Sequence, residues 1–359
     1  MKITHIDKWQ VVVPIAPDAL NSPEFDPLDE DLAFFWKTPK HIIRVHTDDS
    51  GIVGIGESHR GCPDAQMQQA IDRITGMEVH DINLHALPIP MGSAYGAMEM
   101  ALFDIVGKSL GVTVARLLGA QVRDRVAVDY WTARRTPADL ARKAKQGKEL
   151  GFHGIKIKCA LGDPNVERLQ AVVDAVGPDF KVTVDPNCRF HLPCHTIAFA
   201  DALGELRQSV AVFEDPVPKD NLDWYVMLRQ KLQVPIALHL GSGRAVYDAV
   251  RRGAVDMLNI SPYSMVEFVR QCYIAEQAGV PVWHGSGVDL GILDMSYVHA
   301  CAAAPAATLP SDIVGNFVRD DDLLVNPIVI RDGYAEVPDA PGLGVELDEV
   351  ALEKYKVDG

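Results

Sequence analysis

The chain has 359 residues, 48% of them hydrophobic and 23% charged, which is typical of a globular enzyme and excludes a disordered or fibrous protein. This length suits about two domains, or one large barrel with an accessory domain. Lys and Arg number 34 and Asp and Glu 49, so the net charge is −15, which disfavours binding to nucleic acid or to an anionic membrane.

The start of the chain has no apolar stretch of signal-peptide length, and no 18-residue apolar run occurs. The six cysteines contain no CxxC pair, so we interpret them as reduced thiols rather than a disulfide framework. Together these features predict a cytoplasmic protein.

The first 60 residues have the pattern of a three-stranded antiparallel sheet. Strand-like runs span 3–13, 41–47 and 52–57, and Asp49-Ser50-Gly51 forms a turn before the third. A long loop, about 14–40, separates the first two runs and contains Trp36 near its end. We interpret this loop either as a substrate lid, with Trp36 as a substrate contact, or as plain mobile surface.

Residues 93–118 carry apolar side chains at helical spacing and predict a buried helix broken at Gly111. A second helix is expected to begin at Asp163-Pro164 and to end at Gly177-Pro178, because these are capping and helix-breaking residues.

From residue 126 onward the sequence repeats one unit, a short apolar run that ends in a polar residue and is followed by a helical stretch. The ends of successive runs lie 22 to 29 residues apart, as the β/α units of a parallel barrel require. The seven runs end at Asp129, Lys158, Asp185, Glu214, His239, Ser261 and His284. An eighth run, near 307–314, is expected to close the barrel.

In such a barrel the carboxyl ends of the strands face one shared pocket, so these polar residues are predicted to converge. Asp185 and Glu214, on neighbouring strands, suit a hard divalent cation, and His239 on the next strand would complete a set of three ligands. Lys156 and Lys158 lie at alternate positions of one strand, and a lysine beside a metal can act as a base. This combination favours removal of a proton α to a carboxylate.

The sequence resembles the enolase superfamily, and within it the mandelate racemase/muconate lactonizing enzyme group, over essentially the whole chain. The similarity rests on Gly56-Glu57, the helix at 97–120, GIKIK with its Lys-x-Lys motif, VDPN (184–187), FEDP (213–216) and the tail GYAEVPDAPGLGVELDE.

The resemblance implies an α/β fold: a modified TIM barrel, (β/α)7β, with an N-terminal α+β capping domain. We expect the capping domain to span 1–125, the barrel 126–325, and a C-terminal segment, 326–359, to return to the capping domain. It also implies a divalent metal, Mg2+ above all, a small carboxylate substrate and a homo-oligomer.

The fifth strand departs from the family pattern, because His239 stands where many members have Asp. An imidazole removes one negative charge and is a softer donor, so the site would favour Mn2+ or another transition metal more than usual. Alternatively the metal site is degenerate and His239 contacts the substrate.

The sixth strand departs as well, because Ser261 stands where members carry a Lys base or the Asp of a His-Asp pair. This disfavours a cycloisomerase or a dipeptide epimerase. His284 on the seventh strand corresponds to the histidine of racemases and acid-sugar dehydratases, and Asp289 is a candidate for its missing carboxylate partner.

We therefore expect an acid-sugar-type dehydratase that abstracts the α-proton of a small hydroxy or sugar carboxylic acid and eliminates water. The alternatives are a racemase or epimerase that uses Lys158 and His284 on opposite faces, and a degenerate carboxylate-binding protein without turnover. The expected catalytic residues are Lys158, Lys156 and His284, and the expected metal ligands are Asp185, Glu214 and His239. Candidate substrate contacts are Asn187, Arg189, Asn259, Ser261, His59 and Trp36.

Overall fold

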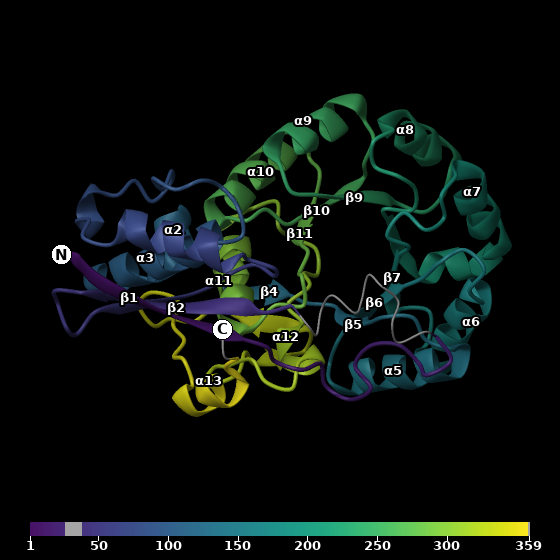
Figure 1. Ribbon diagram of the computed structural model, residues 1–359. Coiled ribbons are helices and arrows are strands. Elements are labelled where there is room, and N and C mark those ends of the chain that lie inside the picture. Colours follow the sequence, from purple (N-terminus) through teal and green to yellow (C-terminus); the bar gives the residue numbers. More distant parts are fainter. Residues whose placement is uncertain (26–37, 358–359) are drawn as a thin grey trace.

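The computed structural model describes residues 1–25 and 38–357 and consists of an N-terminal α+β unit beside a curled parallel sheet surrounded by helices (Figure 1). The loop expected at about 14–40 lies partly, and Trp36 wholly, outside the described residues. Within the described part of the chain, no helix is both long and apolar enough to span a membrane. All six cysteines are free.

The N-terminal sheet is antiparallel, in the order β1-β2-β3, as its alternating pattern predicts. Its strands are β1 (Ile3–Val11), β2 (Lys40–Thr47) and β3 (Val53–Glu57). The unit also contains α2 (Asp64–Ile74), the short 3-10 helix η1 (Val79–Asp81), α3 (Tyr95–Leu110) and α4 (Val114–Leu118).

The helix expected over 93–118 is interrupted at Gly111, which ends α3 in a left-handed conformation with φ of 69°. A β-carbon at Gly56 would lie 2.0 Å from the carbonyl oxygen of Ala97, and one at Gly54 would lie 2.1 Å from that of Ala101. Only glycine therefore lets α3 pack directly on β3.

The main sheet is parallel, in the order β11-β10-β9-β8-β7-β6-β5. Its strands are β5 (Tyr130–Thr132), β6 (Gly154–Lys158), β7 (Lys181–Asp185), β8 (Val210–Glu214), β9 (Ile236–Leu240), β10 (Met257–Ile260) and β11 (Val282–His284). The helices of the unit are α5 (Pro137–Glu149), α6 (Asn165–Val176), α7 (Pro193–Ala202), η2 (Gly204–Ser209), α8 (Leu222–Lys231), α9 (Gly243–Arg252), α10 (Met265–Gln277), α11 (Gly291–Ala303) and α12 (Gly315–Val318). Helices α5 to α10 form an arc around these strands in Figure 1.

The prediction that the first barrel strand is the run ending at Asp129 is wrong, because that run lies outside the main sheet. Residues Arg125–Ala127 form β4, which pairs with β13 (Tyr334–Glu336) in a small sheet that also contains β12 (Ile330–Arg331). The first barrel strand is instead β5. The pairing partner of β4 lies about 200 residues further along the chain, so local pattern could not reveal it.

The eighth run, expected near 307–314, does not form a strand among the described residues. Pro310 lacks an N–H group and cannot continue a ladder. The segment still links β11 to β4, because Asp312 N donates to His284 O at 2.8 Å and Ser311 N donates to Ala127 O at 2.7 Å.

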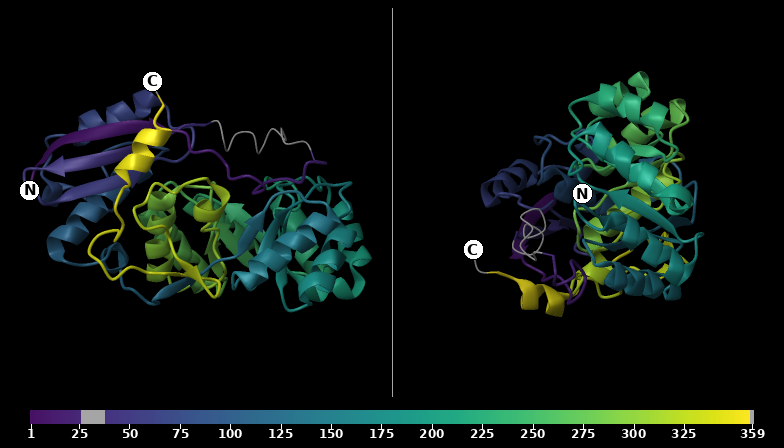
Figure 2. Two further views of the ribbon diagram at one scale, coloured as in Figure 1. Left: turned by 90° about the horizontal axis from the view of Figure 1, so that it is seen from below. Right: turned by 90° about the vertical axis from the view of Figure 1, so that its right-hand side faces the viewer.

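The C-terminal segment runs back to the N-terminal sheet, where α13 (Glu349–Tyr355) lies beside β1 (Figure 2). Val12 N donates to Tyr355 O, and Val357 N donates to Gln10 O. The division of the chain at 125 and 325 remains a prediction.

Candidate active site

Lys158, Asp185 and Glu214 are the last residues of three adjacent strands of the barrel, β6, β7 and β8. His239 lies near the end of β9 and His284 ends β11. Since the carboxyl ends of parallel strands share one face of a barrel, the local fold brings these side chains to a common mouth.

Four of the expected residues form one ion-pair network. The Lys156 Nζ lies 2.7 Å from Glu214 Oε2 and 3.4 Å from Asp185 Oδ2, and Lys158 Nζ donates to the same oxygen of Asp185. Lys156 also contacts Asp312 Oδ2 at 2.9 Å. Lys156 is buried, whereas 13% of the Lys158 side chain is exposed, so Lys158 is the more accessible of the two lysines.

The two carboxylates at the centre of this network differ in proton affinity. Burial, reinforced by the charge of Asp185, raises the pKa of Glu214 to about 8. Burial also opposes ionisation of Asp185, but Lys158 and Lys156 hold its pKa below the usual value. Burial alone would lower the pKa of Lys156, yet Asp312, Glu214 and Asp185 keep it well above its ordinary value.

His239 turns its ring toward Glu214 and Ser261. Its Nδ1 lies 3.7 Å from Glu214 Oε1, and its Nε2 hydrogen-bonds Ser261 Oγ. Burial and the nearby Lys156 lower the pKa of His239 well below the ordinary value, so the ring is neutral and can offer a lone pair. Its main-chain N–H donates to Asp215 Oδ1 at 2.9 Å.

These residues fit a divalent cation. Two of the expected ligands, Glu214 and His239, group with Asp215 rather than with the expected Asp185: one donor atom from each of the three lies within 4.8 Å of the others. The negative charges of the buried Asp185 and Glu214 repel each other, and a bound cation would reduce this repulsion. A set of carboxylate oxygens with one imidazole nitrogen suits Mn2+ or Zn2+ better than it suits Mg2+.

His284 is a neutral, stacked imidazole. Its ring lies 3.5 Å from that of Tyr297 at an interplanar angle of 9°, and burial lowers its pKa to about 3 although Asp289 opposes this. Nδ1 lies 3.3 Å from Ile260 O, which can only accept, so Nδ1 carries the proton. The buried Nε2 has no hydrogen-bond partner among the described residues.

Asp289, the candidate partner of His284, belongs to a second buried network. Lys40 Nζ lies 2.7 Å from Asp289 Oδ1 and also pairs with Glu57. Glu57 in turn accepts from Leu290 N and Leu293 N at the start of α11. Burial opposes ionisation of Asp289, but Lys40 and His59 keep its pKa below the usual value.

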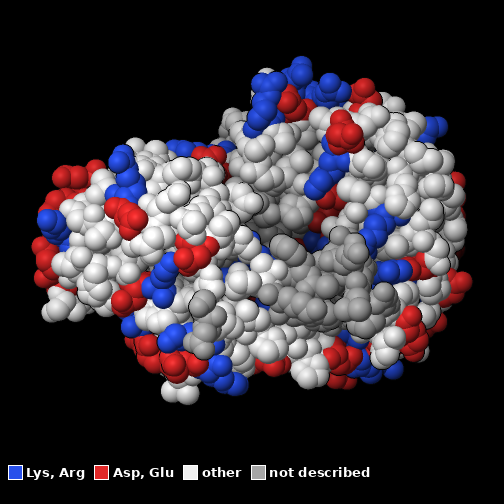
Figure 3. Space-filling model, viewed as in Figure 1, with Lys and Arg blue, Asp and Glu red and all other residues white. Residues whose placement is uncertain are grey.

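The mouth of the barrel contains two adjoining cavities of about 370 and 450 Å3, which share Arg60, His239 and Ser286. Figure 3 shows this face hollowed near its centre, with charged side chains around the hollow. The first cavity is also lined by Lys156, Lys158, Asn187, Arg189, Trp131, Val288, Asp312 and Val314. The second is also lined by His59, Ser261, Tyr263, His284, Gly285, Gly287 and Asp289.

The expected substrate contacts therefore fall into different places. Asn187 and Arg189 line the first cavity, and Ser261 and His59 line the second. Asn259 is buried and donates from Nδ2 to Glu214 Oε1 at 2.8 Å, so it orients that carboxylate and lines neither cavity as described.

Sequence reasoning gave no role to Lys40 or Asp312. Asp312 lies inside the expected eighth run, near 307–314, so ending that run two residues earlier would have placed Asp312 among the polar run ends. Nothing local distinguishes Lys40, whose partners are 17 and 249 residues away.

Comparison with known proteins identifies the family of this site. Residues 139–351 match the enolase C-terminal domain-like family, and residues 36–119 match the N-terminal domain of the mandelate racemase/muconate lactonizing enzyme family. An arabinonate dehydratase of Saccharolobus solfataricus is 26% identical, covering 89% of this chain and 91% of the relative. An N-succinylamino acid racemase of Amycolatopsis is 31% identical, covering 73% and 72%.

The fold agrees with that of a solved structure. The N-succinyl Arg/Lys racemase of Bacillus cereus superposes with a TM-score of 0.86 at 22% identity, covering 100% of this chain and 99% of that one. The chain belongs to the mandelate racemase/muconate lactonizing enzyme group of the enolase superfamily.

Proposed function

We propose that this enolase-superfamily enzyme, whose shared chemistry is abstraction of a proton α to a carboxylate, is a dehydratase of a small hydroxy or sugar acid. The observation that carries the proposal is that the two candidate acid/base groups, Lys158 and His284, differ in their accessibility and in their ability to carry a proton. Lys158 is partly exposed to the first cavity, whereas His284 is buried, with a pKa near 3.

Elimination of water needs only one group that moves protons. Lys158, in its neutral form, would take the α-proton, and the resulting ammonium would pass that proton to the hydroxide leaving the β-carbon. The C–H and C–O bonds break, water departs, and the enol product tautomerises to a 2-keto acid. A divalent cation held by Asp185, Glu214 and His239 would supply positive charge to the substrate carboxylate.

The other residues would bind and orient the substrate. His284 Nε2, which carries a lone pair, is suited to accept a hydrogen bond from a substrate hydroxyl. Lys156 would hold Asp185 and Glu214 in position through its contacts with both.

Racemisation is the second candidate, and the similarity to the Amycolatopsis racemase supports it. A racemase would use Lys158 and His284 on opposite faces of the substrate. The low pKa of His284 argues against this, since its protonated form is scarce at neutral pH.

Proton NMR in D2O tests the proposal. The protein is incubated with Mg2+ or Mn2+ and a panel of hydroxy acids, sugar acids and N-acylamino acids, and the α-hydrogen is followed. Loss of that signal with formation of a keto acid lighter by one water supports dehydration. An isomer that differs in mass only by the deuterium taken up at the α-carbon would establish racemisation. Absence of exchange with any compound by folded, metal-loaded protein would favour a binding protein without turnover.

A further inference from the structure

A second group of candidate metal-binding side chains lies on the N-terminal sheet, on strands that contribute no side chain to the network of Lys156, Lys158, Asp185 and Glu214. We propose that His5, Asp7 and His46 form a surface site for one transition-metal ion of the Zn2+ class. This site is independent of the proposed dehydratase activity.

The register of the sheet alone brings the three residues together. His5 and Asp7 are two positions apart on β1, so their side chains leave the same face of the strand. His46 on β2 is the direct cross-strand partner of His5. Side chains at directly opposite positions have β-carbons about 5 Å apart, which is within reach of a shared ligand.

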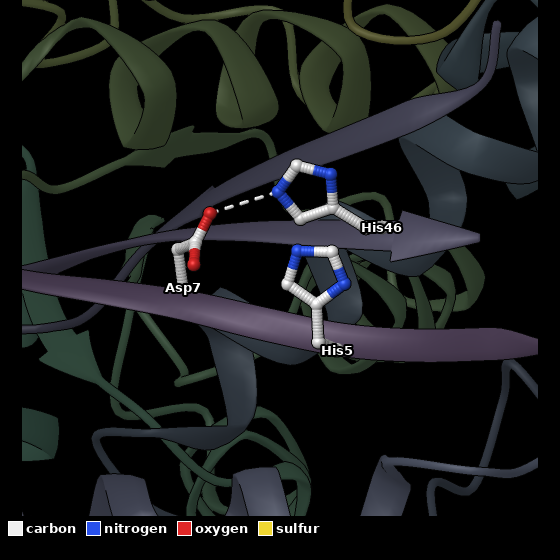
Figure 4. A group of neighbouring side chains, drawn as sticks. All are labelled: His5, Asp7 and His46. Atoms are coloured by element: carbon white, nitrogen blue, oxygen red, sulfur yellow. Dashed lines mark hydrogen bonds and ion pairs between the residues drawn. The ribbon is translucent and has the colours of Figure 1, made fainter. Parts of the chain in front are cut away.

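The side chains of His5, Asp7 and His46 also lie close together. The two imidazole rings are stacked, with centroids 4.0 Å apart and an interplanar angle of 6°. His46 Nε2 lies 2.8 Å from Asp7 Oδ2, and one donor atom from each residue lies within 4.8 Å of the others. Figure 4 shows the two rings one above the other, with the Asp7 carboxylate beside the ring of His46.

Thr4 fixes the orientation of one ligand. Its hydroxyl donates to the carbonyl of His46 at 3.3 Å and must therefore accept from His5 Nδ1, which lies 3.2 Å away. The proton of His5 then sits on Nδ1, and Nε2 keeps the lone pair that a metal requires. A hydrogen bond at the non-ligating nitrogen is the usual support of a metal-binding histidine.

The chemistry of the donors selects the ion. Two imidazoles and one carboxylate suit Zn2+, Ni2+ or Cu2+, whereas Mg2+ and Ca2+ require mostly oxygen ligands. Asp7 and His46 are 42% and 25% exposed, so water can fill the remaining positions. A metal here would join β1 to β2 and stabilise the edge of the sheet.

Calorimetric titration with Zn2+, in excess Mg2+ to occupy oxygen-rich sites, tests the proposal. The wild type is compared with His46→Gln, His5→Asn and Asp7→Asn, and His80→Gln, at an exposed histidine elsewhere in the same unit, is the control. Circular dichroism verifies that each variant is folded.

We expect each site variant to bind one equivalent of Zn2+ fewer than the wild type and the control, and to lose the rise in melting temperature that Zn2+ produces. Anomalous scattering at the zinc edge should place an ion between the three residues. Unchanged stoichiometry in folded His46→Gln and His5→Asn, with no anomalous peak there, would overturn the proposal.

Discussion

The Lys40 ammonium and the Asp289 carboxylate, 2.7 Å apart and both buried, join the first residue of β2 to the loop that follows β11. Together with Glu57 they connect the N-terminal sheet to the barrel by charge. Removing one partner of a buried ion pair leaves an uncompensated charge, which typically costs about 3–5 kcal/mol.

We therefore expect Lys40→Met to lower the free energy of unfolding by about that amount, measured by urea denaturation. Lys145→Met, at an exposed position, is the matched control and should change stability by less than about 0.5 kcal/mol. The double variant Lys40→Met/Glu57→Gln should recover part of the loss, since one stranded charge is gone. A loss below about 1 kcal/mol in Lys40→Met would show that the pair is not the link we describe.

Lys158→Met should reduce α-proton exchange by about 10²- to 10⁴-fold, because a positioned acid/base group contributes a factor of that size. Exchange into D2O is measured by NMR with the substrate found in the panel. Lys145→Met should exchange at the wild-type rate. If Lys158→Met also keeps that rate, another residue is the base.

His239→Asp should shift the metal preference toward Mg2+. The substitution replaces an imidazole with a third carboxylate, and hard oxygen donors favour Mg2+. The ratio of activation constants for Mg2+ and Mn2+ reports the change, and Ser261→Ala, which removes only the hydroxyl bonded to His239, is the control. An equal ratio in His239→Asp and the wild type would argue that residue 239 does not ligate the metal.

His284 should make the protein acid-sensitive. Its pKa is about 3 when folded and 6.5 in a model compound, so between these values the unfolded chain binds a proton that the folded one excludes. The stabilisation is complete above about pH 6.5 and is lost as pH falls toward 3. Lowering the pH from 7 to 5 should cost about 2 kcal/mol through this residue.

His284→Phe keeps an aromatic ring against Tyr297 and should lose correspondingly less stability between pH 7 and 5. Unfolding midpoints in urea at the two values measure the difference, with His80→Gln as control. An identical pH dependence in His284→Phe and the wild type would contradict the buried neutral state of this histidine.

Elements with a regular local signal could be predicted from the sequence. The alternating pattern of β2 and the repeat of apolar runs identified the strands whose ends carry Lys158, Asp185 and Glu214. Prediction failed where distant segments decide the structure: β4 pairs with β13 instead of joining the barrel, and Pro310 lies where the eighth strand was expected.

The candidate site, like the fold, could be predicted only where it depends on local sequence pattern. Convergence of the polar run ends followed from barrel geometry, whereas the burial of His284 against Tyr297 and the pairing of Lys40 with Asp289 depend on packing between remote segments. The burial of His284 changes the proposed role of this residue from an acid/base group to a neutral hydrogen-bond acceptor for the substrate.

The return of the C-terminal segment to β1 has a consequence for synthesis. β1 lies at the edge of its sheet, and among the described residues part of that edge is covered by residues 355–357, which the ribosome makes long after the strand itself. Until then the strand presents unpaired backbone groups to other chains, which is a recognised hazard for aggregation. Nascent chains that stall before this segment should therefore depend on chaperones far more than completed ones.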